Sequence, residues 1–514
     1  MTNKKRIFAI LGILLVFAVV VVCFLFINKE PTTTEVSQIT EPIMAYIDFR
    51  DDEIRVNEEL ITQDSTNSVY LSNDIIYRIK GMEASLGHGY IKGKMSDTQN
   101  VEEVQSIKVI NITSPGVYQL TGNLLDGQIN VDLGQSAKNN PEAKVVLILD
   151  NATVRCHTAP AIVFQNVYEF DKTAVFENNG YNEERNEIKI PGEQFGAQII
   201  LAEGSFNQLY GAGITVNLED DGSDNAAHKM DGTINSNTSL YIAGKDEAAV
   251  LQISAENEGI STQKHLLIEN GAYFINSNDD AINANADNIS IIEVKDANIY
   301  ACGGEGEDED ALDSNGYINI ESGIVLLTSG DELSAGLDAD IAARINGGTV
   351  ISFGSTHDWP SAKSEQTVIN LEIRKSDRVI DGFMLTDAND KPLIALNFNE
   401  GIGEFIAGRY AEYSAISISS PLLKQGETYH IYLGTKMEGE SYIAKAMGEE
   451  PNIIDRGTQY AFSNYRVSNF KEEIEAPDLK PEFEGDRFKK KTYPDFKLYG
   501  TINNFGGLEP VRSK

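Results

Sequence analysis

Short apolar runs alternate with Gly, Asn and Asp along most of the chain. Examples are SIKVINI, QINVDL, KVVLILDNATV, SLYIAG, YINIESGIVLL and RINGGTVISFG. Runs of this length, rich in β-branched residues and bounded by turn formers, predict strands joined by turns. The pattern predicts no amphipathic helix of useful length between them, so we expect an all-β protein.

The strand pattern repeats at a spacing in the twenties. Aliphatic residues that follow a polar turn fall 22, 30 and 25 residues apart: Ile260, Ile282, Leu312 and Leu337. Turns after the next strand fall 26, 26 and 25 residues apart: Asn270, Asp296, Ser322 and Gly347. Such a period predicts a parallel β-helix (solenoid), in which each strand stacks on its counterpart in the next coil. An antiparallel sandwich also has many short strands, but its hairpins have no reason to repeat one turn motif.

The N-terminus carries a different pattern. Basic residues at 4–6 precede 21 apolar residues, 7–27, which is about the length that crosses a bilayer core. We expect residues 1–27 to form an uncleaved N-terminal transmembrane helix, a single-pass anchor in the cell membrane with the rest of the chain extracellular. A cleaved signal peptide with secretion, and lipid attachment at Cys23, are the alternatives.

Changes in composition divide the rest of the chain. Residues 28–45, rich in Thr, Pro and Glu, read as a linker. The β-helix is expected over residues 46–354. A small C-terminal β-rich cap follows over 355–434, because the open end of a solenoid must be covered. Residues 435–514 read as a polar extension.

The net charge of the chain limits the classes of molecule that it is expected to bind. There are 42 Lys and Arg against 78 Asp and Glu, a net charge of -36. This balance argues against binding to nucleic acid phosphates or anionic lipid head groups, and it favours a divalent cation as partner. The three cysteines show neither a disulfide framework nor a zinc-site spacing.

Stacking the repeats places carboxylates in columns. Strands stack about 4.8 Å apart, and two carboxylates near 5 Å repel by roughly 3 kcal/mol at an effective dielectric of about 20. Ca²⁺ takes 6 to 8 oxygen ligands in flexible geometry and would remove that cost. The alternative is that these are exposed acidic turns that keep the protein soluble. The metal ligands predicted from the columns are Glu258, Asp279, Asp280, Asn283, Asp310, Asp313, Asp338 and Asp340.

Two further residues are weak candidates for substrate binding. Arg344, just past the last acidic column, could act as the base of a calcium-dependent lyase or merely balance charge. Trp359, where the solenoid gives way to the cap, could stack on a sugar ring or pack the junction. No HExxH or GxSxG motif is present, and no catalytic residue is predicted.

The stretches quoted above, with NDDAINA, DEDALDSNGYINI and ISISSPLLKQGETYHIYLG, resemble the carbohydrate-binding domain-containing proteins of the clostridial cellulose- and polygalacturonate-binding type. The resemblance covers about residues 72–434. It implies a right-handed parallel β-helix, bound calcium, non-catalytic binding to plant polysaccharides and an exported or surface location. The Asp-rich turns of the family map onto residues 310–316, 279–283 and 337–340.

We therefore expect a non-enzymatic, calcium-binding protein at the cell surface that binds a plant or wall polysaccharide, of the cellulose or polygalacturonate (pectin) type. Calcium could bridge the protein to an acidic glycan, since a chain at -36 would otherwise repel a polyanion. Two alternatives remain open: a calcium-dependent pectate-type lyase and a structural surface adhesin that binds no glycan.

Overall fold

A computed structural model provides the structure of the protein. It describes residues 42–50, 53–78, 90–92, 107–157, 159–173, 186–211, 215–217, 227–229, 232–304, 309–330, 334–355, 359–361, 363–372, 381–407 and 415–460.

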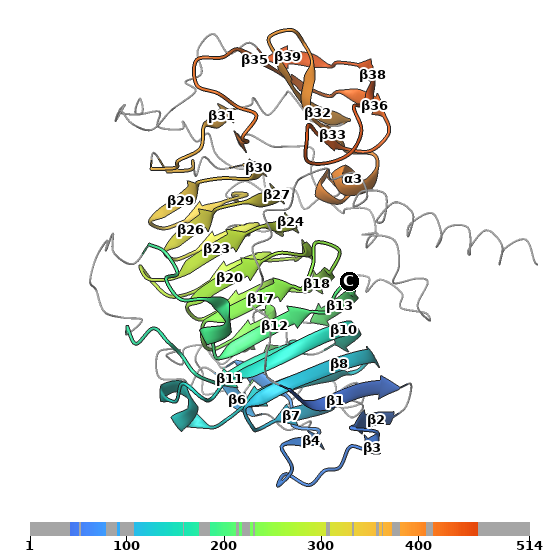
Figure 1. Ribbon diagram of the computed structural model, residues 1–514, viewed down its shortest axis with the longest axis vertical. Coiled ribbons are helices and arrows are strands. Elements are labelled where there is room, and N and C mark those ends of the chain that lie inside the picture. The colour runs from blue at the N-terminus through green and yellow to red at the C-terminus, as the bar shows by residue number, and fades with distance from the viewer. Residues whose placement is uncertain are drawn as a thin grey trace, which may run out of the picture.

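Most of these residues lie in strands stacked along the long axis of the molecule, with a smaller β unit at one end (Figure 1). The largest sheet contains β1 (Ile43–Arg50), β2 (Glu53–Val56), β3 (Glu59–Leu60), β8 (Gly116–Leu124), β10 (Val145–Cys156), β12 (Ala197–Leu201), β13 (Phe206–Gly211), β17 (Leu240–Gly244), β18 (Val250–Ala255), β20 (His265–Glu269), β21 (Ala272–Asn276), β23 (Ile291–Lys295), β24 (Ala297–Cys302), β26 (Tyr317–Ile320), β27 (Gly323–Thr328), β29 (Ala342–Ile345), β30 (Thr349–Gly354), β31 (Val368–Glu372) and β34 (Ala415–Ser419).

A second sheet of nine strands runs alongside it: β4 (Val69–Ser72), β7 (Lys108–Ile112), β9 (Gly127–Asp132), β11 (Ile162–Asn166), β16 (Gly232–Ser236), β19 (Glu258–Thr262), β22 (Ile282–Ala284), β25 (Leu312–Ser314) and β28 (Asp338–Ala339). Two short pairs are β5 (Ile76–Arg78) with β6 (Tyr90–Lys92) and β14 (Thr215–Asn217) with β15 (Ala227–Lys229). Consecutive strands of the nine-stranded sheet from β7 to β28 pair in parallel, whereas β4 pairs antiparallel to β7.

The large sheet consists of two rows of parallel strands. The first row is β12, β17, β20, β23, β26 and β29, and the second is β13, β18, β21, β24, β27 and β30. Both rows start from β10, whose first half pairs with β12 and whose second half pairs with β13. Asn151, in the left-handed region at φ 53°, lies at the bend between the halves.

This arrangement corrects the predicted fold class, a right-handed parallel β-helix with a cap and a transmembrane helix. The large sheet is a single, nearly closed, barrel-like sheet rather than separate flat faces, because β8 and β10 are long enough to join the two rows. Antiparallel strands also belong to it: β2 pairs with β1 at one end, and β34 pairs with β30 and β31 at the other.

The predicted membrane anchor is also corrected. Within the described ranges, no helix is long and apolar enough to span a membrane. The predicted segment, residues 7–27, lies outside the described residues. The single-pass anchor is therefore no part of the described fold, and the cell-membrane location that rested on it is not upheld.

Aliphatic columns fill the interior of the stack. Ile260 pairs in register with Ile282, and Ile282 with Leu312, and all three side chains are fully buried. The position before each of them carries Gly or Ala because the coils approach closely there: a Cβ on Gly259 would lie 2.4 Å from the carbonyl oxygen of Ala281. The predicted repeat thus marks the inward face, where burial of each aliphatic side chain contributes about 1.5–3 kcal/mol.

The unit at the far end of the stack packs on the outer side of the second row through Phe353, Phe383 and Ile406. It contains β32 (Gly382–Asp387), β33 (Pro392–Asn397), α3 (Gly401–Ala407), β35 (Tyr429–Leu433), β36 (Lys436–Glu438), β37 (Tyr442–Ile443), β38 (Asn452–Asp455) and β39 (Thr458–Tyr460). β37 and β39 join this sheet from beyond residue 434, within the range predicted as a polar extension.

A connection between β11 and β12, called here the strap, lies against the first row; its described residues are 167–173 and 186–196. Asp171 Oδ2 accepts a hydrogen bond from His265 Nε2 at 3.1 Å. The amide of Ile188 donates to Glu293 Oε2 at 2.9 Å. Burial opposes ionisation of Asp171, but hydrogen bonds from His265 and Thr173 outweigh it and hold the pKa of Asp171 well below its usual range.

Candidate functional site

The candidate site lies on the outward face of the nine-stranded sheet. Successive side chains of a strand point to opposite faces, so the residue after each buried aliphatic position points outward. These residues pair in register from strand to strand: Ser261 with Asn283, Asn283 with Asp313, and Asp313 with Asp338. The in-register alignment predicted from the spacing of the aliphatic positions is confirmed.

A second set of carboxylates precedes the same strands. Glu258, Asp280 and Asp310 are 6%, 6% and 2% exposed. Asp280 Oδ1 accepts a hydrogen bond from the backbone amide of Asp310 at 2.7 Å, and Asp310 Oδ1 accepts one from the amide of Ala335. Asp280 and Asp310 therefore each accept a hydrogen bond from the backbone of the next coil, which holds them at the side of the stack.

Asn283 joins the two sets. Its Nδ2 donates to Glu258 Oε1 at 3.2 Å and to Asp280 Oδ2 at 3.0 Å. The side chain is 7% exposed, and its Oδ1 is buried without a hydrogen-bond partner. One amide group thus compensates part of the charge of two carboxylates, and its carbonyl oxygen is left over as a potential ligand atom.

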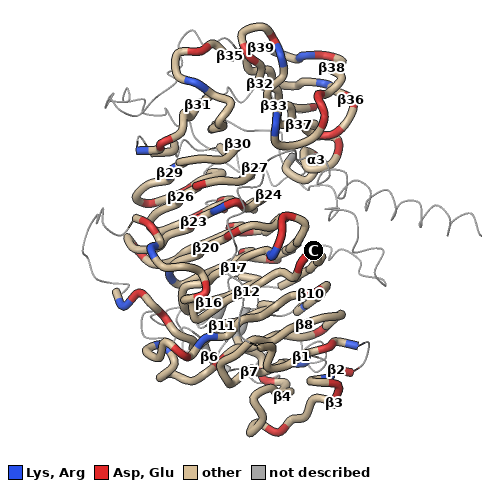
Figure 2. The backbone as a smooth tube through the Cα atoms, viewed as in Figure 1, with Lys and Arg blue, Asp and Glu red and all other residues tan. Residues whose placement is uncertain are grey.

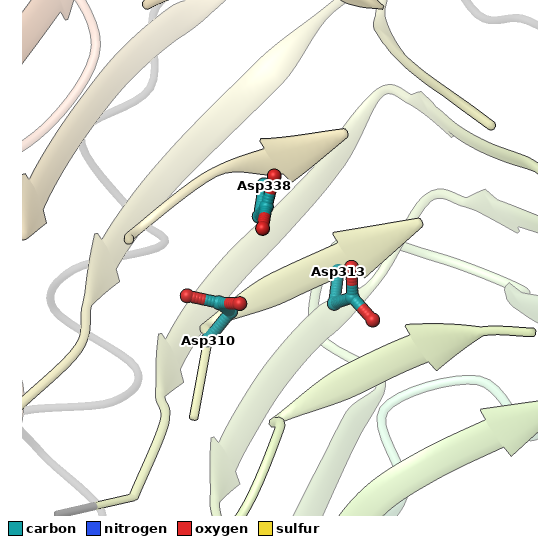
Figure 3. A group of neighbouring side chains, drawn as sticks. All are labelled: Asp310, Asp313 and Asp338. Carbon is teal, nitrogen blue, oxygen red and sulfur yellow. The ribbon is translucent and has the colours of Figure 1, made fainter. Parts of the chain in front are cut away.

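Three carboxylates converge at the end of the column. Asp310, Asp313 and Asp338 each offer an oxygen atom within 4.8 Å of the other two. Figure 3 shows Asp313 and Asp338 on neighbouring strands and Asp310 just before the strand that carries Asp313. Asp310 is buried, and Asp313 and Asp338 are half-buried. The group is therefore compact enough for one cation and open on one side to an approaching ligand.

The electrostatics of the column favour neutralisation. Burial raises the pKa of Asp280 well above its ordinary value, and the negative charges of Glu258, Asp313 and Asp310 raise it further. The hydrogen bond from the amide of Asp310 opposes the shift but does not cancel it. Without a cation nearby, Asp280 takes up a proton more readily than a carboxyl group in water.

The donor set suits calcium. Carboxylate oxygens from three residues and the leftover amide oxygen of Asn283 are the hard oxygen ligands that Ca²⁺ prefers. Of the predicted ligands, Asp340 is exposed and Asp279 is half-buried, and neither belongs to the group of three. Asp340 and Asp279 flank the strands at the corners, where alternation no longer determines which way a side chain points.

The two residues predicted to bind substrate, Trp359 and Arg344, are not members of the acidic group. Trp359, 36% exposed, lines a small pocket of about 10 Å³ together with Gly336, Leu337 and Ser352. Gly336 and Leu337 directly precede Asp338, so this pocket adjoins the acidic group along the chain. Arg344 lies on β29 of the large sheet, and the acidic group belongs to the nine-stranded sheet. Asn319, the in-register neighbour of Arg344, was not among the predicted residues, although the 25-residue spacing between the two follows the repeat.

The chain was compared with protein families, curated proteins and solved structures. The model of the carbohydrate-binding domain-containing protein family matches residues 106–186 and 188–390. No curated protein matches the chain. Among solved structures, a similar chain is the polysaccharide lyase-like protein from C. thermocellum (gadolinium derivative), with 18% sequence identity and a TM-score of 0.35. The match covers 59% of this chain and 92% of that one.

The family match spans more than half of the chain, including the coils that carry the acidic column. It confirms the resemblance found in the sequence. The chain belongs to the carbohydrate-binding domain-containing protein family.

Proposed function

We propose that the chain is a non-catalytic carbohydrate-binding protein that binds Ca²⁺ and recognises a plant or wall polysaccharide of the cellulose or polygalacturonate type. The observation that carries the metal is the convergence of Asp310, Asp313 and Asp338 within 4.8 Å. Membership of the carbohydrate-binding family supports binding to a polysaccharide.

Asp310, Asp313 and Asp338 would hold the ion, with Asn283 close enough in the column to contribute its free carbonyl oxygen. A bound Ca²⁺ would supply positive charge on an otherwise acidic face. That charge would permit an acidic polymer to approach a chain whose net charge is -36. Trp359, beside the same coil, is a platform on which a sugar ring could stack.

The placement of Arg344 supports a non-catalytic protein. A calcium-dependent lyase needs its base beside the metal-bound sugar. Arg344, the one base candidate from the sequence, lies on β29 of the large sheet, whereas Asp313 and Asp338 lie on β25 and β28 of the nine-stranded sheet. The alternative function, a pectate-type lyase, is tested by an assay for unsaturated product.

Two measurements on the full chain test the proposal. Calorimetric titration with Ca²⁺ is expected to show binding that the double substitution Asp313→Asn, Asp338→Asn weakens at least tenfold. Asp340→Asn is the matched control, because Asp340 lies two residues away but outside the group; it should leave the titration unchanged. No heat of binding at millimolar Ca²⁺ would refute the metal site.

Affinity electrophoresis in gels that contain polygalacturonate or a soluble cellulose derivative tests the glycan. We expect retardation in the presence of Ca²⁺, a decrease on addition of chelator, and no ultraviolet absorbance from unsaturated product. Product formation would favour the lyase instead. Equal mobility in all polysaccharide gels would favour the adhesin.

A further inference from the structure

Residues 335–337, called here the pocket loop, connect the acidic group to the pocket beside Trp359. All three residues of the loop line that pocket, and the rest of the lining comes from Trp359 itself, from β30 and from β34: Ser352, Gly354, Ala415 and Ser417. Ala335 and Leu337 are 3% and 2% exposed. The position of this buried loop therefore determines the shape of the pocket.

The first residue of the pocket loop is held by Asp310. The amide of Ala335 donates a hydrogen bond to Asp310 Oδ1, and the carbonyl oxygen of Ala335 accepts one from the amide of Ala311 at 3.1 Å. Just before the loop, Ser334 Oγ accepts a hydrogen bond from the amide of Glu309 at 3.0 Å. A hydrogen bond to an ionised carboxylate is about twice as strong as one between neutral groups. The Asp310 side chain therefore determines where the loop begins.

The last residue of the pocket loop directly precedes Asp338. Asp338 begins β28, which pairs with β25 through Asp313. Asp310 and Asp338 each offer an oxygen atom within 4.8 Å of the other. A carboxylate has two oxygens with about four acceptor sites, so Asp310 can bind an ion and still accept the hydrogen bond from Ala335. Both ends of the loop are thus attached to side chains that one ion would bind.

The pocket loop also packs closely against β30. A Cβ on Gly336 would lie 2.1 Å from Ser352 Oγ and 3.1 Å from the carbonyl oxygen of Phe353. The pocket volume is about 10 Å³, which is enough for about one water molecule. Because so little space is left, a small displacement of the loop changes the contacts of the Trp359 side chain.

We propose that Ca²⁺ bound by Asp310, Asp313 and Asp338 fixes the pocket loop and thereby orders the pocket beside Trp359. The inference rests on the proposed metal site and adds the regulation of the neighbouring pocket. Without the ion, the three carboxylates repel one another, which opposes a fixed separation between the two ends of the loop. Coupling between two binding sites is reciprocal, so a molecule that binds the ordered pocket would raise the affinity for Ca²⁺.

The fluorescence of Trp359 tests the coupling, because it is the one tryptophan of the chain. The full chain is titrated with Ca²⁺ while the tryptophan emission is recorded. We expect a change in emission whose midpoint equals the dissociation constant from calorimetry. The double substitution Asp313→Asn, Asp338→Asn should lose the emission change together with the binding. Asp340→Asn, the matched control, should retain both.

Ala335→Pro separates the coupling from the metal site, because proline has no amide hydrogen to donate to Asp310. This variant should retain the heat of Ca²⁺ binding and lose the emission change. Hydrogen exchange of the parent adds a measurement that needs no variant. The amides of residues 334–337 should exchange more slowly in Ca²⁺ than in chelator, whereas those of β8 should be unchanged.

Two results would overturn the coupling and leave the metal site intact. The first is a heat of Ca²⁺ binding in the parent without a change in emission or in exchange at residues 334–337. The second is an emission change in Ala335→Pro as large as that in the parent, since Trp359 would then respond without the hydrogen bond to Asp310. Absence of any heat of binding in the parent would instead refute the proposed metal site, and the coupling with it.

Discussion

Two ends of one column of side chains behave differently. The outward column of the nine-stranded sheet begins with amides and ends with carboxylates, in register throughout: Asn111, Asn130, Val163, Asn235, Ser261, Asn283, Asp313 and Asp338. At the amide end, Asn130 Nδ2 donates to Asn111 Oδ1 at 2.9 Å, and Gln165 Nε2 donates to Asn130 Oδ1 at 2.6 Å.

The difference lies in what each group can offer its neighbour. An amide is both donor and acceptor, so stacked amides satisfy one another. A carboxylate is only an acceptor, so stacked carboxylates need a proton or a cation. The binding chemistry is therefore expected where the column cannot complete its own hydrogen bonds. In Figure 2, charged residues lie mostly in loops and at strand ends, and most strand segments carry none.

Placing a charge at the amide end should have the largest effect. Asn130 is 5% exposed, and Asn130→Asp would bury a carboxylate beside the acceptor oxygen of Asn111. We expect a loss of about 3 kcal/mol in the free energy of unfolding at neutral pH, measured by urea denaturation. Because protonation relieves the repulsion, the loss should shrink as the pH is lowered.

The control for this variant is Asn140→Asp, an exposed position in a turn. It should change stability by less than about 0.5 kcal/mol. If Asn130→Asp were equally harmless, the contrast between amide and carboxylate ends would lose its basis.

Removing charge at the acidic end should have the next largest effect. If Ca²⁺ binds as proposed, a concentration of about 100 times the dissociation constant would stabilise the folded protein by about 2.7 kcal/mol. Asp313→Asn should abolish most of this calcium-dependent increment, measured as the difference between unfolding in Ca²⁺ and in chelator. Asp279→Asn, outside the group of three, should retain it. An undiminished increment in Asp313→Asn would show that the ion binds elsewhere.

The smallest effect concerns pH. The folded-state pKa of Asp280 is raised by burial and by neighbouring carboxylates, so the folded protein binds this proton more tightly than the unfolded chain. The resulting stabilisation is present below the unfolded pKa, near 3.9, and is lost as the pH rises through the folded pKa. In chelator, Asp280→Asn should flatten this part of the pH dependence of unfolding. A curve identical to that of the parent would show that Asp280 is not the group that titrates.

Sequence alone predicted the register of the acidic column because the inward positions tolerate only aliphatic residues. The spacing of Ile260, Ile282 and Leu312 therefore aligned their neighbours correctly, even across the 30-residue interval. The same reasoning does not place Asp279 and Asp340, which lie at corners where the alternation of a strand ends. The spacing of the aliphatic positions also does not predict that Asn283 connects the carboxylates of Glu258 and Asp280, because these hydrogen bonds depend on side-chain conformation.

Long-range closure was beyond the sequence pattern. The segment KVVLILDNATV reads as a strand followed by a turn, yet β10 continues through Asn151 and joins two rows. The packing of the strap on the first row could not be predicted from the sequence either, because Asp171 contacts His265, which lies 94 residues further along the chain. Neither contact leaves a periodic signal.

The antiparallel strands at the two ends of the stack determine how the protein is completed during synthesis. β4 precedes its partner β7 in the chain, and β1 and β2 precede β8. The strands that pair with the first coil are therefore synthesised before it. β30 ends at Gly354, but its final partner β34 begins only at Ala415. During synthesis, the edge of β30 therefore stays unpaired while about sixty further residues are translated. A chain truncated in that interval keeps this exposed strand edge and is expected to aggregate.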